Sequence, residues 1–155
     1  MNILLGCLLL ILSTYVGTCF SKKYTERNIF YNDFIVFNNN LKNEINYSQN
    51  TIFYILNNKT RKNSDFYNCV KAFFFDKQTF VFEKNYINNE EKTFFNNYLQ
   101  TIGSGDKVAQ LKYVELISQQ LKEKVKKTEE DQLKYKSTYI KLGFLVGLIL
   151  LIVLL

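Results

Sequence analysis

The sequence predicts an all-α membrane protein, in which a cytosolic helical bundle, residues 21–141, lies between two transmembrane helices, residues 1–20 and 142–155. Three observations predict this fold class. All 20 Lys and Arg residues and all 14 Asp and Glu residues lie between Lys22 and Lys141, so both ends of the chain are apolar. The chain contains no proline. Apolar residues of the middle segment recur at steps of three and four, and the last such helix is expected to continue into the second span.

The first apolar segment, residues 1–20, is long enough to cross a hydrocarbon core ~30 Å thick, because a helix rises ~1.5 Å per residue. A cleaved signal peptide is one alternative, but the residues before the apolar run include no basic side chain. An exported lipoprotein acylated at Cys19 is another, although Thr18 is a poor residue to precede an acylated cysteine. A membrane span is the interpretation that we prefer.

The second apolar segment, residues 142–155, is shorter. It approaches the lower limit of about 17 residues for a span when Tyr139 and Ile140 are included and the Lys141 side chain extends to the membrane surface. The alternative is a buried helix of a soluble protein. A helix that is apolar on every face would need a shell of protein that the rest of the chain hardly provides.

Basic residues border both spans on the side of the middle segment, and none lies beyond either span. They are Lys22, Lys23, Arg27, Lys134, Lys136 and Lys141. Basic side chains near the ends of spans remain on the cytosolic side of a membrane. We therefore expect a hairpin, with a cytosolic middle domain and both termini outside.

The first part of the middle segment is expected to form several short helices. Their apolar stripes or caps predict helices over residues 24–47 and 52–56, after Ser64, and after Asn88 or Asn89. The stripe of the first helix consists of Phe30, Phe34, Phe37, Leu41 and Ile45, and the asparagines at 38–40 lie mostly off it. Residues 79–83 alternate like a strand, but no second strand is evident, so helix or loop is the preferred interpretation.

The last helix is expected to begin near Asp106 and to continue past Gly143 without a break. Its apolar stripe consists of Val108, Leu111, Val114, Ile117, Leu121 and Val125. Residues 122–136 are mostly charged, so they are expected to project as a solvated stalk. The basic cluster of this stretch could bind an acidic partner or anionic lipid headgroups, but a solvated face with pairs such as Glu123 with Lys127 is preferred. The cluster consists of Lys122, Lys124, Lys126 and Lys127. Nucleic-acid binding is not expected, because acidic residues are interleaved with the basic ones.

The segment TIGSGD, residues 101–106, resembles a phosphate-binding loop only superficially. Such a loop follows a strand and ends in Gly-Lys-Ser/Thr, whereas here Asp106 interrupts the pattern and Val108 replaces the hydroxyl. The segment is interpreted as a joint between two helices. Gly103 would cap the first helix, and Ser104 or Asp106 would cap the second.

Catalytic, cofactor and metal sites are not expected. The chain has no histidine, its three cysteines have no paired spacing, and adjacent acids on a helix diverge rather than converge on a substrate. The spans instead contain small residues at four-residue spacing, Ser13 with Gly17 and Gly143 with Gly147. Such pairs let membrane helices approach closely. In the expected hairpin both pairs lie at a similar depth, and they are candidates for helix packing.

Over nearly its whole length the chain resembles the stage III sporulation protein AB family. The similar stretches are TYVGTCFSKKYTER, NEINYSQNTIFYIL, QTIGSGDKVAQLKYVELISQQL and KLGFLVGLILLIVLL. Glu44 and Tyr47 occupy positions of the second stretch, and Gly103, Asp106 and Gln110 occupy positions of the third. A proline that usually follows the second stretch is missing, as is a tryptophan in residues 76–88.

The resemblance implies a non-enzymatic mother-cell component of the channel between mother cell and engulfed forespore, in the outer forespore membrane. It also implies a soluble domain similar to the cytoplasmic domains of type II secretion platform proteins. The expected partners are a cytosolic secretion-type ATPase and other membrane subunits, and an oligomer is possible. Glu44, Tyr47, Gly103, Asp106 and Gln110 are candidates for structural or partner contacts. The alternatives are an exported lipoprotein with an extracytoplasmic binding domain and a membrane-bound enzyme.

Overall fold

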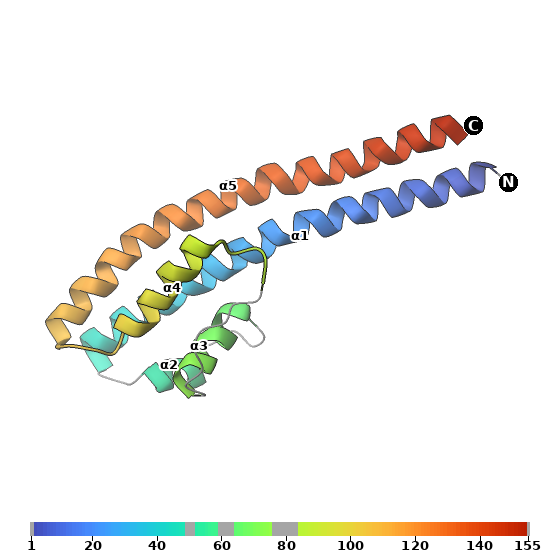
Figure 1. Ribbon diagram of the computed structural model, residues 1–155. Coiled ribbons are helices and arrows are strands. Elements are labelled where there is room, and N and C mark those ends of the chain that lie inside the picture. Colours follow the sequence, from blue (N-terminus) through green and yellow to red (C-terminus); the bar gives the residue numbers. More distant parts are fainter. Residues whose placement is uncertain (1, 49–51, 59–63, 76–83, 155) are drawn as a thin grey trace. The chain divides into compact units, whose positions relative to one another are not determined.

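The computed structural model describes residues 2–48, 52–58, 64–75 and 84–154. Over these ranges the chain is helical and contains no strand. The elements are α1 (Asn2–Asn43), η1 (Glu44–Ser48, a π-helix), α2 (Ile52–Asn58), α3 (Asp65–Phe75), α4 (Asn89–Thr101) and α5 (Lys107–Leu154) (Figure 1). The all-helical fold class is therefore confirmed. Residues 79–83, for which helix or loop was expected, lie outside the described residues.

The chain divides into two compact units. Unit 1 comprises Met1–Asn28 and Lys127–Leu155, and unit 2 comprises Ile29–Lys126. Helices α1 and α5 contribute residues to both units, whereas α2, α3 and α4 belong to unit 2 alone.

Unit 2 has an aromatic core built on the predicted stripe of α1. Phe34 is fully buried, and its ring centroid lies 5.2 Å from that of Phe66 on α3 and 4.7 Å from that of Tyr98 on α4. The other buried stripe residues of α1 are Phe30, Phe37 and Leu41. The first pair is stacked and the second is edge-to-face, and both geometries add attraction to the apolar area that the rings bury. This stripe therefore holds α3 and α4 against α1.

Helix α5 closes the core of unit 2 with Val114, Ile117 and Leu121, which are all buried. Asn38 of α1, which the sequence placed off the apolar stripe, is also fully buried. Its Nδ2 donates to the carbonyl oxygen of Val114 at 3.0 Å and to Oγ of Ser118 at 2.8 Å. These two bonds offset part of the cost of burying the amide, whose Oδ1 has no hydrogen-bond partner among the described residues. Asn38 therefore fixes the register of α1 against α5.

The start of α4 combines a local cap with a long-range bond. The Asn88 side chain accepts from the backbone N–H of Glu91, and the Glu91 side chain accepts from that of Asn88. This reciprocal pair satisfies two backbone donors that the helix leaves free. Glu91 also accepts from the Tyr31 hydroxyl at 2.8 Å, so the cap is tied to α1.

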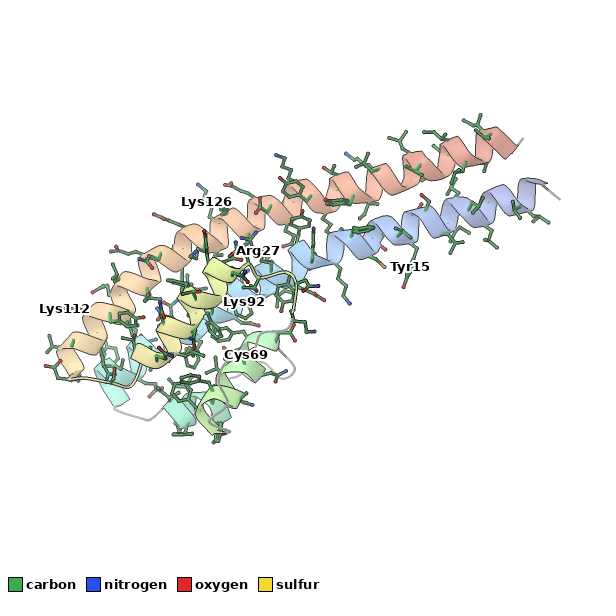
Figure 2. All side chains as sticks on the ribbon, viewed as in Figure 1. Tyr15, Arg27, Cys69, Lys92, Lys112 and Lys126 are labelled. Atoms are coloured by element: carbon green, nitrogen blue, oxygen red, sulfur yellow. The ribbon has the colours of Figure 1, made fainter. Side chains whose placement is uncertain are left out.

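In unit 1 the charged portion of α5 packs on α1. Thr128 is almost completely buried, and its hydroxyl donates to Oδ1 of Asn28 at 3.2 Å. The Asn28 amide donates to Oε1 of Gln132, and Arg27, labelled in Figure 2, forms an ion pair with Asp131 at 3.3 Å. The expectation of a fully solvated stalk was wrong for this face of α5, because α1 supplies a matching set of polar side chains.

Both helices of unit 1 also contain a long apolar stretch. An 18-residue window has a mean hydropathy of 1.9 in α1 and 1.8 in α5. Only 17% and 6% of these windows are buried, unlike the core helix of a soluble protein. Two candidate membrane-spanning helices therefore fit a membrane protein, by length and composition. The cytosolic orientation of the middle domain stays a prediction.

Candidate functional site

The joint between α4 and α5 is a tight turn of unit 2. The backbone N–H of Ile102 donates to the carbonyl oxygen of Tyr98 at 3.0 Å. This is the last backbone hydrogen bond of α4, and Ile102 is its C-cap. Gly103 and Gly105 have φ angles of 83° and 86°, a left-handed conformation that side chains with a Cβ rarely adopt. The sequence therefore needs glycine at both positions in order to reverse direction within so few residues.

Asp106 begins α5. Its Oδ1 accepts from the backbone N–H of Ala109 at 2.8 Å, and its carbonyl oxygen accepts from the backbone N–H of Gln110 at 3.0 Å. Of the two caps considered from the sequence, the structure thus assigns the role to Asp106. The Gln110 side chain donates to the carbonyl oxygen of Gly105 at 3.2 Å and braces the turn from inside α5. A carboxylate at this helix end complements the positive end of the helix dipole and disfavours a bound phosphate.

The end of α1 lies beside this joint within unit 2. Lys107 donates from Nζ to the carbonyl oxygen of Asn46 in η1 at 3.2 Å. Glu44 of the same segment is only 3% exposed, whereas Tyr47 is 85% exposed. The structure therefore brings the five candidate residues to two adjoining segments, but it separates their environments. Glu44 is part of the packed interior, and Tyr47 faces outward.

We call residues 44–48 together with residues 103–110 the joint surface. A hollow of about 340 Å³, open to solvent, adjoins it and is lined partly by Leu41, Gln110 and Tyr113. Val108 on this surface is 59% exposed. The sequence had placed Val108 on the buried stripe of α5, and that expectation was wrong, because the first buried residue of α5 is Val114. The exposure of Val108 and the hollow were not evident from sequence.

The candidate packing residues of the two apolar segments come together in unit 1. The Ser13 hydroxyl donates to the carbonyl oxygen of Gly143 at 2.5 Å. A Cβ added at Gly17 would lie 2.5 Å from the carbonyl oxygen of Tyr139, and one added at Gly143 would lie 3.2 Å from Cα of Gly17. These distances leave no room for a side chain at either glycine. The two backbones are therefore in direct contact.

Two further close approaches continue along the same pair of helices. A Cβ at Gly147 would lie 2.8 Å from Cα of Leu10, so Gly147 packs against Leu10 rather than against Ser13 or Gly17. A Cβ at Gly6 would lie 3.7 Å from Cβ of Leu151, which is ordinary contact. The part played by Leu10 and Leu151 cannot be found from a motif, because both belong to runs of similar aliphatic residues.

The chemistry of these sites is that of packing and capping. Within the described ranges, no three His, Cys, Asp or Glu side chains lie close enough together to hold a metal ion. The side chains of Asp106 and Gln110 bond to backbone groups of the joint itself. The joint surface is partly apolar, with Tyr47 and Val108 exposed.

The family model of stage III sporulation protein AB matches residues 68–155, more than half of the chain. The chain belongs to this family. No curated protein and no solved structure matches it significantly. The matched range includes α4, the joint and α5, so Gly103, Asp106 and Gln110 lie inside it, whereas Glu44 and Tyr47 lie outside. The stage III sporulation protein AB family implies a role in sporulation, and it is not a known family of enzymes.

We predict that Asp106→Ala lowers the free energy of unfolding by about 0.5–2 kcal/mol, because the backbone N–H of Ala109 loses its acceptor. Asp106→Asn is the matched control, since an asparagine side chain can accept the same hydrogen bond and should retain most of the stability. Chemical unfolding of the full chain in detergent, followed by circular dichroism, measures both. Equal stability of the alanine variant and the wild type would contradict the capping role.

We also predict that Gly147→Leu separates the two apolar helices, because its Cβ would clash with the backbone of Leu10. A disulfide between Gly6→Cys and Leu151→Cys reports this, since Cβ atoms 3.7 Å apart suit a disulfide. The native cysteines are replaced by alanine. The disulfide should form readily in the otherwise wild-type chain and much less after Gly147→Leu. The neighbouring exposed Val146→Leu is the control and should leave cross-linking unchanged. Equal cross-linking of all three proteins would rule out close packing at Gly147.

Proposed function

We propose that this chain is a non-enzymatic membrane platform of the secretion-like channel complex between mother cell and forespore. In this role the joint surface docks the cytosolic ATPase of the same complex. The observation that carries the proposal is the exposure of Tyr47 and Val108 on the two adjoining segments of the joint surface. The family resemblance supports the choice of an ATPase as the partner.

The joint surface suits a protein partner for physical reasons. Tyrosine is enriched among the residues that dominate binding energy, because a rigid ring buries a large area at a small entropic cost. Tyr47 is 85% exposed, and the hollow at the joint is lined partly by Ala109 and Gln110. The positive φ angles, the Asp106 cap and the Gln110 bond hold the surrounding backbone in one conformation. Little conformational freedom is therefore lost on binding.

The connection of this surface to the membrane supports a platform role. Helix α5 is one element of 48 residues, which begins at the joint and ends in the second apolar segment. A partner held at its first turn is thus linked to a membrane span by a single helix. In the proposed topology the middle domain lies in the mother-cell cytosol and both termini lie outside. The apolar helices would contact other membrane subunits of the complex, and an oligomer fits this arrangement.

We predict that Tyr47→Ala weakens binding of the purified ATPase to the full chain by at least about tenfold, because removal of a central aromatic anchor commonly costs 2 kcal/mol or more. Its side chain is 85% exposed, so the melting temperature should not change. Leu116→Ala is the control, since Leu116 is a 52% exposed apolar residue elsewhere on α5. Unchanged binding of the ATPase to the single variant Tyr47→Ala, and also to the double variant Tyr47→Ala with Val108→Ala, would refute docking at the joint surface.

We predict that a cysteine at the exposed position Gln100 is protected from a membrane-impermeant thiol reagent in intact cells and labelled after lysis. The native cysteines are replaced in this experiment. Cys69 is the one native thiol of the domain, and burial raises its pKa to about 11, so it would react slowly in any case. A cysteine appended after Leu155 should be labelled in intact cells. Labelling of Gln100→Cys without lysis would exclude the cytosolic ATPase and favour the lipoprotein alternative.

A further inference from the structure

In unit 1, the charged residues of α1 and α5 that lie next to the apolar segments are all lysines. Five lysines lie between the acidic residues and the apolar segments, because the first acid of the chain is Glu26 and the last is Asp131. They are Lys22 and Lys23 on α1 and Lys134, Lys136 and Lys141 on α5, and all five are exposed. This layer therefore carries positive charge alone, at the border of the two apolar stretches.

The same layer contains a stack of aromatic rings between the two helices. The ring centroid of Tyr24 lies 4.7 Å from that of Tyr135 and 5.9 Å from that of Tyr139, and Phe20 lies 6.2 Å from Tyr139. These contacts place Lys22 and Lys23 at the level of Lys134 and Lys136. Nζ of Lys23 lies 5.0 Å from the ring centroid of Tyr24 and 6.0 Å from that of Tyr139. Cation–π contacts of this kind hold the ammonium group at the level of the rings.

The layer adjoins the tightly packed part of the hairpin. Gly17 and Gly143, whose backbones are in contact, lie a few residues beyond it toward the chain ends. Tyrosine and lysine side chains prefer the headgroup region of a bilayer, where an apolar stem meets a polar or charged tip. This level of unit 1 has the composition of a membrane interface.

The acidic side chains closest to this layer form ion pairs. Glu26 lies 3.6 Å from Lys22, and Asp131 is paired with Arg27 at 3.3 Å. Glu129 and Glu130 lie at least one helical turn farther from the span than Lys134. The positive potential of the layer is therefore reduced mainly at Lys22, and Lys23, Lys134, Lys136 and Lys141 remain available to a negatively charged surface.

We propose that this layer, the lysine–aromatic girdle of Phe20, Lys22, Lys23, Tyr24, Lys134, Tyr135, Lys136, Tyr139 and Lys141, binds the headgroups of anionic phospholipids. The ammonium groups pair with lipid phosphates, and the stacked rings keep the two helices together at headgroup depth. The girdle gathers anionic lipid around the hairpin and sets how deeply it sits in the bilayer. This binding is independent of the ATPase, and its test does not involve that partner.

The test uses fluorescence quenching in vesicles. The chain contains no tryptophan, so Phe20→Trp introduces a single reporter at a position that is 57% exposed in the girdle. The full chain is reconstituted in vesicles of phosphatidylcholine and phosphatidylglycerol in fixed proportion, with bromine on one lipid or the other. The ratio of quenching by the two brominated lipids gives the relative affinity for phosphatidylglycerol at the girdle.

We predict a clear preference for phosphatidylglycerol, which the combined change Lys134→Gln, Lys136→Gln and Lys141→Gln lowers by about fivefold or more, since each lysine near a surface contributes about a fivefold factor. The control removes the same charge from unit 2, by Lys112→Gln, Lys122→Gln and Lys126→Gln, and should keep the preference. All six side chains are exposed or half-buried surface lysines, so helicity by circular dichroism should be unchanged.

Three outcomes would overturn the proposal. The first is equal quenching by both brominated lipids in the reporter protein. The second is an equal loss of the preference for phosphatidylglycerol in the two triple variants, which would indicate only a general effect of net charge. The third is removal of the preference by inorganic phosphate but not by chloride at the same ionic strength, which would indicate a site for a free anion. A preference that only the girdle variant loses, and that phosphate does not remove, supports lipid binding.

Discussion

The pairing of the first helix with the last is the interaction on which the rest of each unit depends. The described part of unit 1 consists of α1 and α5 alone, and they touch backbone to backbone at Gly17 and Gly143. In unit 2, α1 carries the aromatic stripe on which Phe66 and Tyr98 pack, and the buried amide of Asn38 ties it to α5. Without this pairing, the apolar segment of α1 has no partner helix, and the core of unit 2 loses the helix that closes it.

Local patterns allowed the elements of the fold to be predicted. The apolar stripe of α1, the long α5 and the asparagine cap of α4 all depend on residues within a few positions of one another, and the structure contains each of them. The polar contacts between α1 and α5 could not be predicted, because their partners are about a hundred residues apart. Arg27 with Asp131 is one case. A side chain such as Asn38 looks like a solvent-facing residue until its distant acceptors are known.

The candidate site also combines features that local sequence predicts with features that depend on distant residues. The joint between α4 and α5 could be predicted from its glycine and capping residues. Asp106 and Gln110 stabilise it through hydrogen bonds to nearby backbone groups. Its closeness to η1 depends on the long-range contact of Lys107 with Asn46, which no spacing in the sequence reveals. For the same reason the sequence grouped Glu44 with Tyr47, although one is interior and the other is exposed. Membership of a family known by its sporulation role then gives this surface a biological setting.

The antiparallel pairing of chain ends also imposes an order on biosynthesis. Ser13 and Gly143, which share a hydrogen bond, are separated by 130 positions. During translation α1 leaves the ribosome while its partner is still unmade, so the glycine face of the first apolar segment remains uncovered until α5 has been synthesised. Folding of unit 2 must wait as well, because the helix that closes its core is the last to be synthesised. The nascent chain therefore has to keep a phenylalanine-rich helix from aggregating until synthesis is almost complete, and early anchoring of its N-terminal segment in the membrane would restrict the encounters that lead to aggregation.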